Sequence, residues 1–246
     1  MKRVGTTPLG AHDEQQTARW VREMFDGVAG RYDLLNHVLS LNIDKRWRTR
    51  TVARVKHVLT RPGAQVLDLC CGTGDLLIEL ERTAGRALWG SDFCHPMLTA
   101  ASRKINDSNL RSKVFEGDAL LLPMRDASLD LITVAFGVRN FANYRKGFAE
   151  MRRVLKPGGV AAILEFSQPK NAAFAKLYGF YSNRVLPRIG AWVSGSSKAY
   201  TYLPESVRGF PGPDELADIL RECGFADVSY QRMTFGIVAL HVAKVQ

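Results

Sequence analysis

The chain has 246 residues, 46% of them hydrophobic, which is enough to bury the core of one large domain. Its formal net charge of +10 favours a polyanionic partner, either an anionic membrane face or a nucleic acid. No apolar stretch reaches the roughly 18 residues of a membrane-spanning helix, and no apolar segment follows the basic start, which argues against a secretory signal.

The first predicted region is a helical preface of residues 1–61. Residues 1–15 are polar and predicted to be loose, whereas 18–59 carry a helical pattern with breaks. Glycines within 25–33 predict a bend in that pattern. The sequence Arg-Pro-Gly at 61–63 separates the preface from a second region, residues 62–246.

Strands and helices alternate after the preface, which is typical of a parallel sheet covered by helices on both faces. The predicted strands are 66–70, 87–91, 113–116, 129–136 and 160–166. Helices are predicted to begin at Asp75 and Pro96, and a third spans 144–155. Residues 156–159, Lys-Pro-Gly-Gly, predict a sharp turn before the fifth strand.

The alternation stops at residues 168–212, which we interpret as an insertion. A helix is predicted over 213–223, with Gly224 ending it. Two strands, 228–234 and 237–245, are joined by so short a connection that they must be antiparallel. The sequence therefore predicts an α/β fold with a seven-stranded Rossmann-like sheet, mostly parallel, ending in an antiparallel hairpin.

A glycine turn follows the first predicted strand, where Gly72 and Gly74 allow the backbone to approach a ligand closely. The third glycine of a dinucleotide fingerprint is replaced by Leu77. Asp68 lies inside the strand, where a carboxylate repels a pyrophosphate but suits a positively charged ligand. S-Adenosylmethionine, which has a sulfonium and an ammonium group, fits this pattern.

Acidic residues also end the second and third predicted strands. Asp92 is placed to accept both ribose hydroxyls, Asp118 to accept the adenine amino group, and the Ala119 amide to donate to the ring. The competing interpretation is that each aspartate caps the following helix. Cys70 and Cys71 flank the turn and are interpreted as small buried residues. The cysteine spacing predicts no metal site.

These features together resemble class I S-adenosylmethionine-dependent methyltransferases, and four segments resemble the UbiE/MenG quinone C-methyltransferases in particular. The similarity runs from about residue 20 to the C-terminus, with Asp44 where the family often has His and Ala135 where it often has Ser. The segments are Tyr32–Ser40 leading to Trp47, Phe136–Asn140, Arg153–Ser167 and Tyr200–Ser206.

The resemblance implies methylation of a ring carbon of a polyprenylated quinol, in menaquinone or ubiquinone biosynthesis. It implies a cofactor site that holds S-adenosylmethionine and releases S-adenosylhomocysteine. The implied cofactor-binding residues are Asp68, Gly72, Thr73, Gly74, Asp92, Phe93, Asp118, Ala119, Ala135 and Tyr32.

Carbon methylation needs an electron-rich ring, and a free phenol has a pKa near 10. A cation that stabilises the phenolate, or a positioned base, therefore contributes to the rate. Arg139 is the predicted stabiliser and Asn140 the group that orients the ring hydroxyl. Asp118, acting through a water, and Tyr200, a donor from the insertion, are further catalytic candidates.

The insertion carries an apolar stripe, interpreted either as a helix pair packed on the sheet or as a tunnel for a prenyl tail. The stripe consists of Phe174, Leu177, Tyr178, Tyr181, Val185, Ile189 and Trp192, with a kink predicted at Pro187. We expect a cytoplasmic protein on the inner membrane face, with a homodimer as one arrangement and no nucleic-acid partner. A phenolic or lipid acceptor of another kind, and a nucleic-acid-binding protein using Trp47 among the basic residues 45–50, are the rival interpretations.

Overall fold

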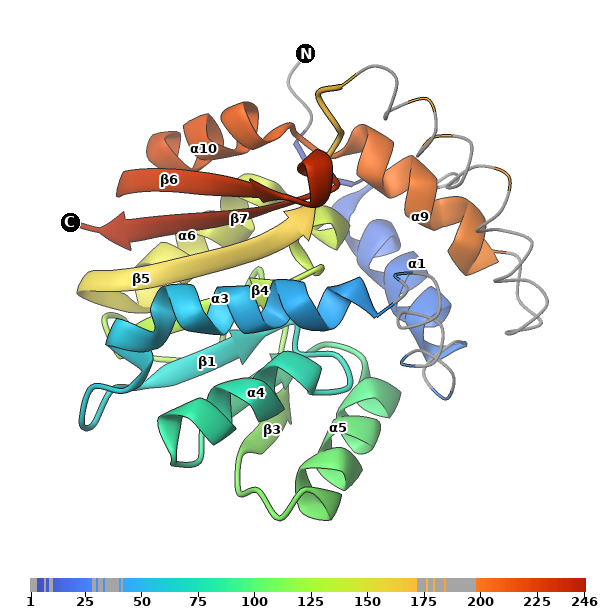
Figure 1. The fold of residues 1–246 in the computed structure, drawn as a ribbon. Coiled ribbons are helices and arrows are strands. Elements are labelled where there is room, and N and C mark those ends of the chain that lie inside the picture. Colours follow the sequence, from blue (N-terminus) through green and yellow to red (C-terminus); the bar gives the residue numbers. More distant parts are fainter. Residues whose placement is uncertain are drawn as a thin grey trace.

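A computed structural model of the chain describes residues 4–6, 8, 11–27, 30, 33, 40, 42–171, 176, 179, 184 and 198–246. In these residues, seven strands form one sheet in the order β3-β2-β1-β4-β5-β7-β6 (Figure 1). The strands are β1 Val66–Leu69, β2 Trp89–Asp92, β3 Lys113–Glu116, β4 Leu129–Ala135, β5 Leu155–Phe166, β6 Phe225–Met233 and β7 Val238–Val245.

The pairing confirms the predicted mixed sheet. Strands β1 to β5 are parallel, whereas β7 runs antiparallel to both β5 and β6. The strand order reverses at β1, whose neighbours are β2 on one side and β4 on the other. In open sheets of this kind, ligands bind at the carboxyl ends of the strands beside such a reversal.

Helices cover both faces of the sheet (Figure 1). The helices of the described residues are α1 Glu14–Asp26, α3 Ile43–Leu59, α4 Asp75–Ala84, α5 His95–Asp107, α6 Tyr144–Val154, α9 Lys198–Gly209 and α10 Pro213–Glu222, of which α1 and α9 lie beyond the carboxyl ends of the strands (Figure 1). The helices α3 and α4 pack on one face, and α6 and α10 on the opposite face. Leu67 and Leu69 face α6, while Val66 faces α3, because side chains alternate along a strand.

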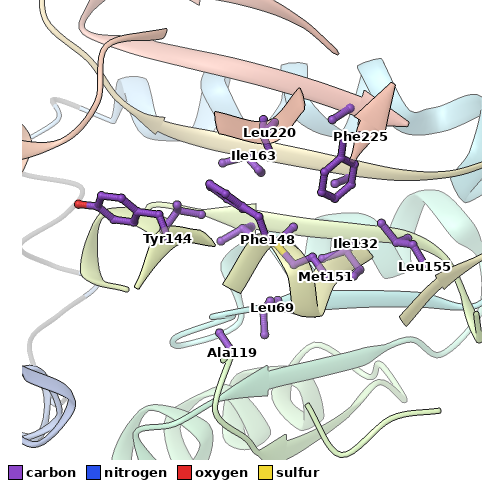
Figure 2. Close-up of a cluster of buried hydrophobic side chains, with 14 of the residues drawn as sticks. Leu69, Ala119, Ile132, Tyr144, Phe148, Met151, Leu155, Ile163, Leu220 and Phe225 are labelled. Atoms are coloured by element: carbon purple, nitrogen blue, oxygen red, sulfur yellow. The ribbon is translucent and has the colours of Figure 1, made fainter. Parts of the chain in front are cut away.

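Each face has its own hydrophobic cluster. Figure 2 shows the cluster under α6 and α10, in which Phe148 and Met151 lie against Ile132 and Ile163 of the sheet. On the other face, Trp47 is buried, and its ring nitrogen Nε1 donates to Thr234 Oγ1 at 2.8 Å. Trp47 is therefore a core residue of this fold and is not exposed as a stacking plane for a nucleic-acid base.

The fifth strand begins earlier than predicted, because β5 starts at Leu155, which pairs with Leu129 of β4. The predicted turn at 156–159 lies inside this strand, as an irregularity before Val160 pairs with Leu131, and Gly158 has a φ of 76° there. The start of the chain is not uniformly loose. Thr6 donates its amide to the Phe141 carbonyl, and α1 begins at Glu14 with Asp13 as its N-cap.

The insertion contributes α9 to the described part of the chain. Helix α9 contains Pro204 and packs against α1. The seven residues of the predicted apolar stripe and Pro187 lie outside the described residues. Among the residues that the structure describes, no helix combines the length and apolar character needed to cross a membrane.

Candidate functional site

The turn after β1 has a left-handed backbone at several positions. Gly72 and Gly74 have φ values of 53° and 86°, and Cys70 has a φ of 55°. Glycine adopts these angles without steric cost, whereas a side chain such as that of Cys70 is uncommon there. The turn leads directly into α4, whose N-cap is Gly74. The predicted strand, glycine turn and helix are thus confirmed as a local structure.

Asp92 fixes the position of this turn. It ends β2 and is buried, and its Oδ2 accepts a hydrogen bond from the Gly72 amide at 2.9 Å. Its Oδ1 accepts from the Cys94 amide at 3.0 Å, just before α5 begins. Burial raises the pKa of the Asp92 carboxyl, and the backbone amides partly oppose that rise. One carboxylate therefore joins the ends of β1 and β2.

Asp68 lies deeper than the turn, within β1. Its side chain is buried, and Oδ1 accepts a hydrogen bond from Thr133 Oγ1 of β4 at 2.6 Å. Burial raises the pKa of this carboxyl to about 7, and the nearby charge of Asp92 acts in the same direction. Two buried acidic groups thus stand close behind the turn, which is an electrostatic setting that favours a bound cation.

The loop after β4 packs tightly on the turn. Phe136 has a positive φ of 60°, and Gly137 follows it. A Cβ on Gly137 would lie 2.5 Å from the Cβ of Cys70, so only glycine fits between the loop and β1. Residues Val138–Asn140 then form a short 3-10 turn, η2. This close packing brings Asn140 to the carboxyl edge of the sheet.

Arg139 is buried in this loop and holds it against β5. Its Nη1 lies 2.9 Å from Oε1 of Glu165 and also donates to the Phe136 carbonyl. The Arg139 amide donates to the other Glu165 oxygen at 3.1 Å, and the guanidinium lies over the Phe166 ring. Glu165 is itself buried, so the two charges neutralise each other inside the protein.

A pocket opens where these segments meet. Seven of the predicted site residues line it: Gly72, Asp92, Phe93, Asp118, Ala119, Ala135 and Asn140. Its wall also contains Ala18, Phe25, Cys70, Met97, Gly117, Leu120, Phe136, Gly137, Phe141 and Ala142. The pocket therefore combines two carboxylates and an amide with a largely apolar lining, as small-molecule sites commonly do.

Four predicted residues stand behind the pocket wall rather than in it: Asp68, Thr73, Gly74 and Arg139. Asp118 is exposed, and its Oδ1 accepts a hydrogen bond from the Leu120 amide at 2.8 Å. Tyr32 and the side chain of Tyr200 lie outside the described residues, so their predicted roles stay predictions.

Helices α1 and α9 cover the pocket. Ala18 and Phe25 of α1 line it, and the Arg22 guanidinium lies 5.5 Å from the centre of the Phe93 ring. From α9, the buried Tyr202 donates its hydroxyl to Asn140 Oδ1 at 3.1 Å. Burial raises the pKa of Tyr202, which keeps it a hydrogen-bond donor at neutral pH. The sequence alone did not indicate that Tyr202 is a hydrogen-bond partner of Asn140.

The donor set suits a nucleoside with a positive charge. The Asp92 carboxylate still has acceptor capacity beyond its two amide donors, as ribose hydroxyls require. The acidic groups Asp68 and Asp92 favour a cation, and Phe93 and Met97 supply apolar surface. These are the properties expected of a site for S-adenosylmethionine.

Sequence reasoning missed Glu165 and the pocket residues of α1. Glu165 interrupts an otherwise apolar buried strand, and a buried carboxylate needs a cationic partner. This was the signal in the sequence for the ion pair that Glu165 forms with Arg139. Phe25 was interpreted only as part of a bend. Its place on the pocket wall depends on how α1 packs against α5 and α9, which no local pattern encodes.

Comparisons with known proteins show the family of this chain. A model of the ubiE/COQ5 methyltransferase family matches residues 11–245. A demethylmenaquinone methyltransferase of Deinococcus radiodurans is 48% identical over 236 residues, which cover 96% of this chain and 95% of that protein. One from Thermus thermophilus is 46% identical over 220 residues, with 89% and 98% covered.

A solved structure provides an independent comparison of the fold. The crystal structure of a SAM-dependent methyltransferase from Aquifex aeolicus matches this chain with a TM-score of 0.58 at 18% identity. The match covers 80% of this chain and 89% of the other. It shows that the two chains share the class I methyltransferase fold.

Gly137→Ala is expected to destabilise the protein, because its new Cβ meets the Cβ and Sγ of Cys70 at 2.5 and 3.0 Å. We expect a loss of about 1–3 kcal/mol in urea unfolding, typical of overpacking. Cys70→Gly removes the Cβ and Sγ of Cys70, at a position where a positive φ suits glycine. The double variant should therefore regain most of the stability that Gly137→Ala loses. Additive effects of the two substitutions would contradict this contact.

Asp68→Asn should make stability less dependent on pH. The pKa of Asp68 is about 7 in the folded protein and about 3.9 when unfolded. The folded state therefore binds the proton more tightly, so this stabilising contribution is complete below about pH 4 and is lost as pH rises to about 7. The melting temperature of the variant relative to wild type should thus rise from about pH 5 to about pH 8. A constant difference would show that Asp68 does not titrate in this range.

Proposed function

Because the chain belongs to the ubiE/COQ5 methyltransferase family, we propose that it transfers the methyl group of S-adenosylmethionine to a ring carbon of a polyprenylated quinol, with demethylmenaquinol as its acceptor. The observation that carries this proposal is that Asp92 and Asn140 line one pocket at the reversal of strand order. One is suited to hold the cofactor ribose and the other to orient an acceptor hydroxyl.

The reaction is a displacement at carbon. When bound, S-adenosylmethionine would supply an activated methyl on its sulfonium group, so that the sulfur–methyl bond would break as the carbon–methyl bond formed and the ring would then lose a proton. The protein must hold the ring carbon in line with that methyl and exclude water from the pocket. Phe25, Phe136 and Phe141 provide the apolar walls that do this.

The cofactor-binding residues divide by the part of the cofactor they suit. Asp92 would accept the ribose hydroxyls, and Asp118 with the Ala119 amide would bind the adenine edge. Phe93 and Met97 would contact the adenine faces, while Gly72, Thr73 and Gly74 shape the turn. Tyr32 is proposed to cover the cofactor from the segment before α3.

Asn140 is the catalytic group that the geometry favours, because it lines the pocket and is oriented by Tyr202. Arg139 is proposed to act on the acceptor through this loop, since its guanidinium is paired with Glu165 behind the wall. Asp118, through a water, and Tyr200 are proposed to take or share the phenolic proton. These roles require no metal ion.

We also propose that the protein associates with an anionic membrane surface, where its prenylated acceptor would reside. The formal net charge of +10 supports this, as do Lys45 and Arg46, which are exposed in the first turn of α3. That turn lies on the pocket side of the sheet, since Trp47 contacts Phe136 and Phe166. Attraction between these basic residues and anionic lipid headgroups would orient the protein with its pocket facing the bilayer.

The direct test is an assay with purified protein, S-adenosylmethionine carrying a labelled methyl group, and chemically reduced demethylmenaquinone. The expected product is menaquinol with the label on a ring carbon. A matched reaction with a demethylated benzoquinol of the same tail length measures the preference for the ring. Transfer only to other phenols or lipids, or none at all, would overturn the proposal.

Asn140→Ala should lower turnover about tenfold or more while cofactor affinity stays within about twofold, because it removes a group that orients the acceptor only. Tyr202→Phe keeps the ring but removes the hydrogen bond to Asn140, and should lower turnover by less. Turnover is measured with labelled cofactor and affinity by calorimetry. A loss of cofactor affinity that matches the loss of turnover would place Asn140 in the cofactor site instead.

Vesicle binding should depend on the basic start of α3. We expect Lys45→Glu/Arg46→Glu to reduce co-sedimentation with anionic vesicles, and about 0.5 M salt to release the wild type, because surface charge attraction is screened. Arg54→Glu/Lys56→Glu is the matched control, since it changes the same charge on exposed residues near the other end of the helix. Equal losses in both variants would mean that net charge alone governs binding.

A further inference from the structure

A cluster of charged and polar side chains lies at the glycine turn, apart from Asp92. It consists of Asp33, Arg48, Thr73, Asp75 and Lys104, which we call the turn cluster. Arg48 comes from α3 and Lys104 from α5, while Asp75 is the first residue of α4. Thr73 belongs to the turn itself, and Asp33 lies in the chain before α3. Five separate segments therefore meet at one turn.

Lys104 is at the centre of the turn cluster. Its Nζ lies 2.8 Å from Asp33 Oδ2, contacts Asp75 Oδ1 more closely still, and is 3.4 Å from Thr73 Oγ1. The Thr73 hydroxyl donates to the other oxygen of Asp33. A single ammonium group thus connects the turn, the start of α4 and the chain that precedes α3.

Arg48 extends these contacts to α3. Its Nη2 lies 2.6 Å from Asp44 Oδ2 and 3.1 Å from Asp75 Oδ2. Asp75 is therefore bridged by two cations from different helices. Asp44 also accepts a hydrogen bond from Ser40 Oγ at 2.6 Å, so the position where the family often has His serves here as a carboxylate partner of Arg48.

The exposure of these groups indicates a role in positioning more than in global stability. The side chains of Lys104 and Asp33 are 30% and 34% exposed, and ion pairs that are open to solvent contribute little to the free energy of unfolding. Removing one should leave the protein folded. What the pair does fix is the placement of Asp33 over Thr73, between the two glycines of the turn.

We propose that Lys104 is a positioning residue for the cofactor, because it fastens Asp33 to the turn and so sets the geometry in which the turn binds its ligand. This inference rests on the proposed function, since it places S-adenosylmethionine at that turn. Asp92 accepts a hydrogen bond from the Gly72 amide, and the turn cluster holds the neighbouring Thr73 through Asp33. Cofactor affinity then depends on two residues, Lys104 and Asp33, that do not line the pocket.

The test is a double-mutant cycle read by calorimetric titration of S-adenosylmethionine. Lys104→Met and Asp33→Asn should each raise the dissociation constant about fivefold, and the double variant by about the same factor, because both variants remove the same Lys104–Asp33 ion pair. Arg103→Met is the control, an exposed residue on the same helix for which the described part of the chain shows no ion pair. It should bind like wild type.

Two further measurements separate positioning from general loss of structure. Lys104→Arg retains the charge and should recover more than half of the lost binding free energy, and the melting temperatures of all variants should stay close to wild type. Raising salt from about 0.05 to about 0.5 M should weaken cofactor binding in wild type more than in Lys104→Met, because the ion pair is screened.

The possible outcomes distinguish this inference from the proposed function. If wild type binds no S-adenosylmethionine, the proposed function fails. If wild type binds it and both single variants bind equally well, only the role of Lys104 fails. Effects that multiply to about 25-fold in the double variant would also overturn it, because they would show two independent residues.

Discussion

The hydrogen bonds from two backbone amides to the Asp92 carboxylate are the constraint on which the site depends. They join the turn after β1 to the start of α5, at distances of 2.9 and 3.0 Å. The glycines of the turn would by themselves allow it many conformations. A buried acceptor at the end of the neighbouring strand selects one of them. The same carboxylate is then already oriented for a ligand that approaches from the pocket.

The remaining walls of the site come from segments that are distant in the sequence. The loop after β4 reaches the turn because Gly137 has no side chain, and the Arg139–Glu165 pair fixes that loop to β5. Helices α1 and α9 contribute Phe25 and the partner of Asn140. The strand ends of the sheet therefore supply the carboxylates and the glycine turn, whereas helices outside the alternating pattern supply Phe25 to the pocket wall and a partner for Asn140.

This division explains what could be predicted from the sequence. The strand ends with Asp92 and Asp118, and the glycine turn, are local patterns, and the structure brings these residues to one pocket. Tyr202 and Asn140 are 62 positions apart in the sequence, and Lys104 and Asp33 are 71 positions apart. Local periodicity cannot predict contacts between residues so far apart. The start of the fifth strand was missed for a related reason: Leu155 pairs with Leu129 of β4, so β5 extends back beyond the turn predicted at Lys156–Gly159, and this tertiary contact leaves no local signal.

The acidic character of the site has a consequence for turnover. Methyl transfer converts a sulfonium cation into a neutral thioether, so the electrostatic attraction between the cofactor and the carboxylates near the turn weakens once the methyl has left. Asp68 and Asp92 are buried where charge is poorly solvated, and burial raises the pKa of each, so a cation in the pocket is their natural counter-charge. Under the proposed function, the loss of the sulfonium charge would therefore weaken the binding of S-adenosylhomocysteine relative to S-adenosylmethionine. An acid-rich pocket suits a cofactor that loses one positive charge in the reaction, whereas a phosphate-binding site would have amides and glycines at the same strand ends.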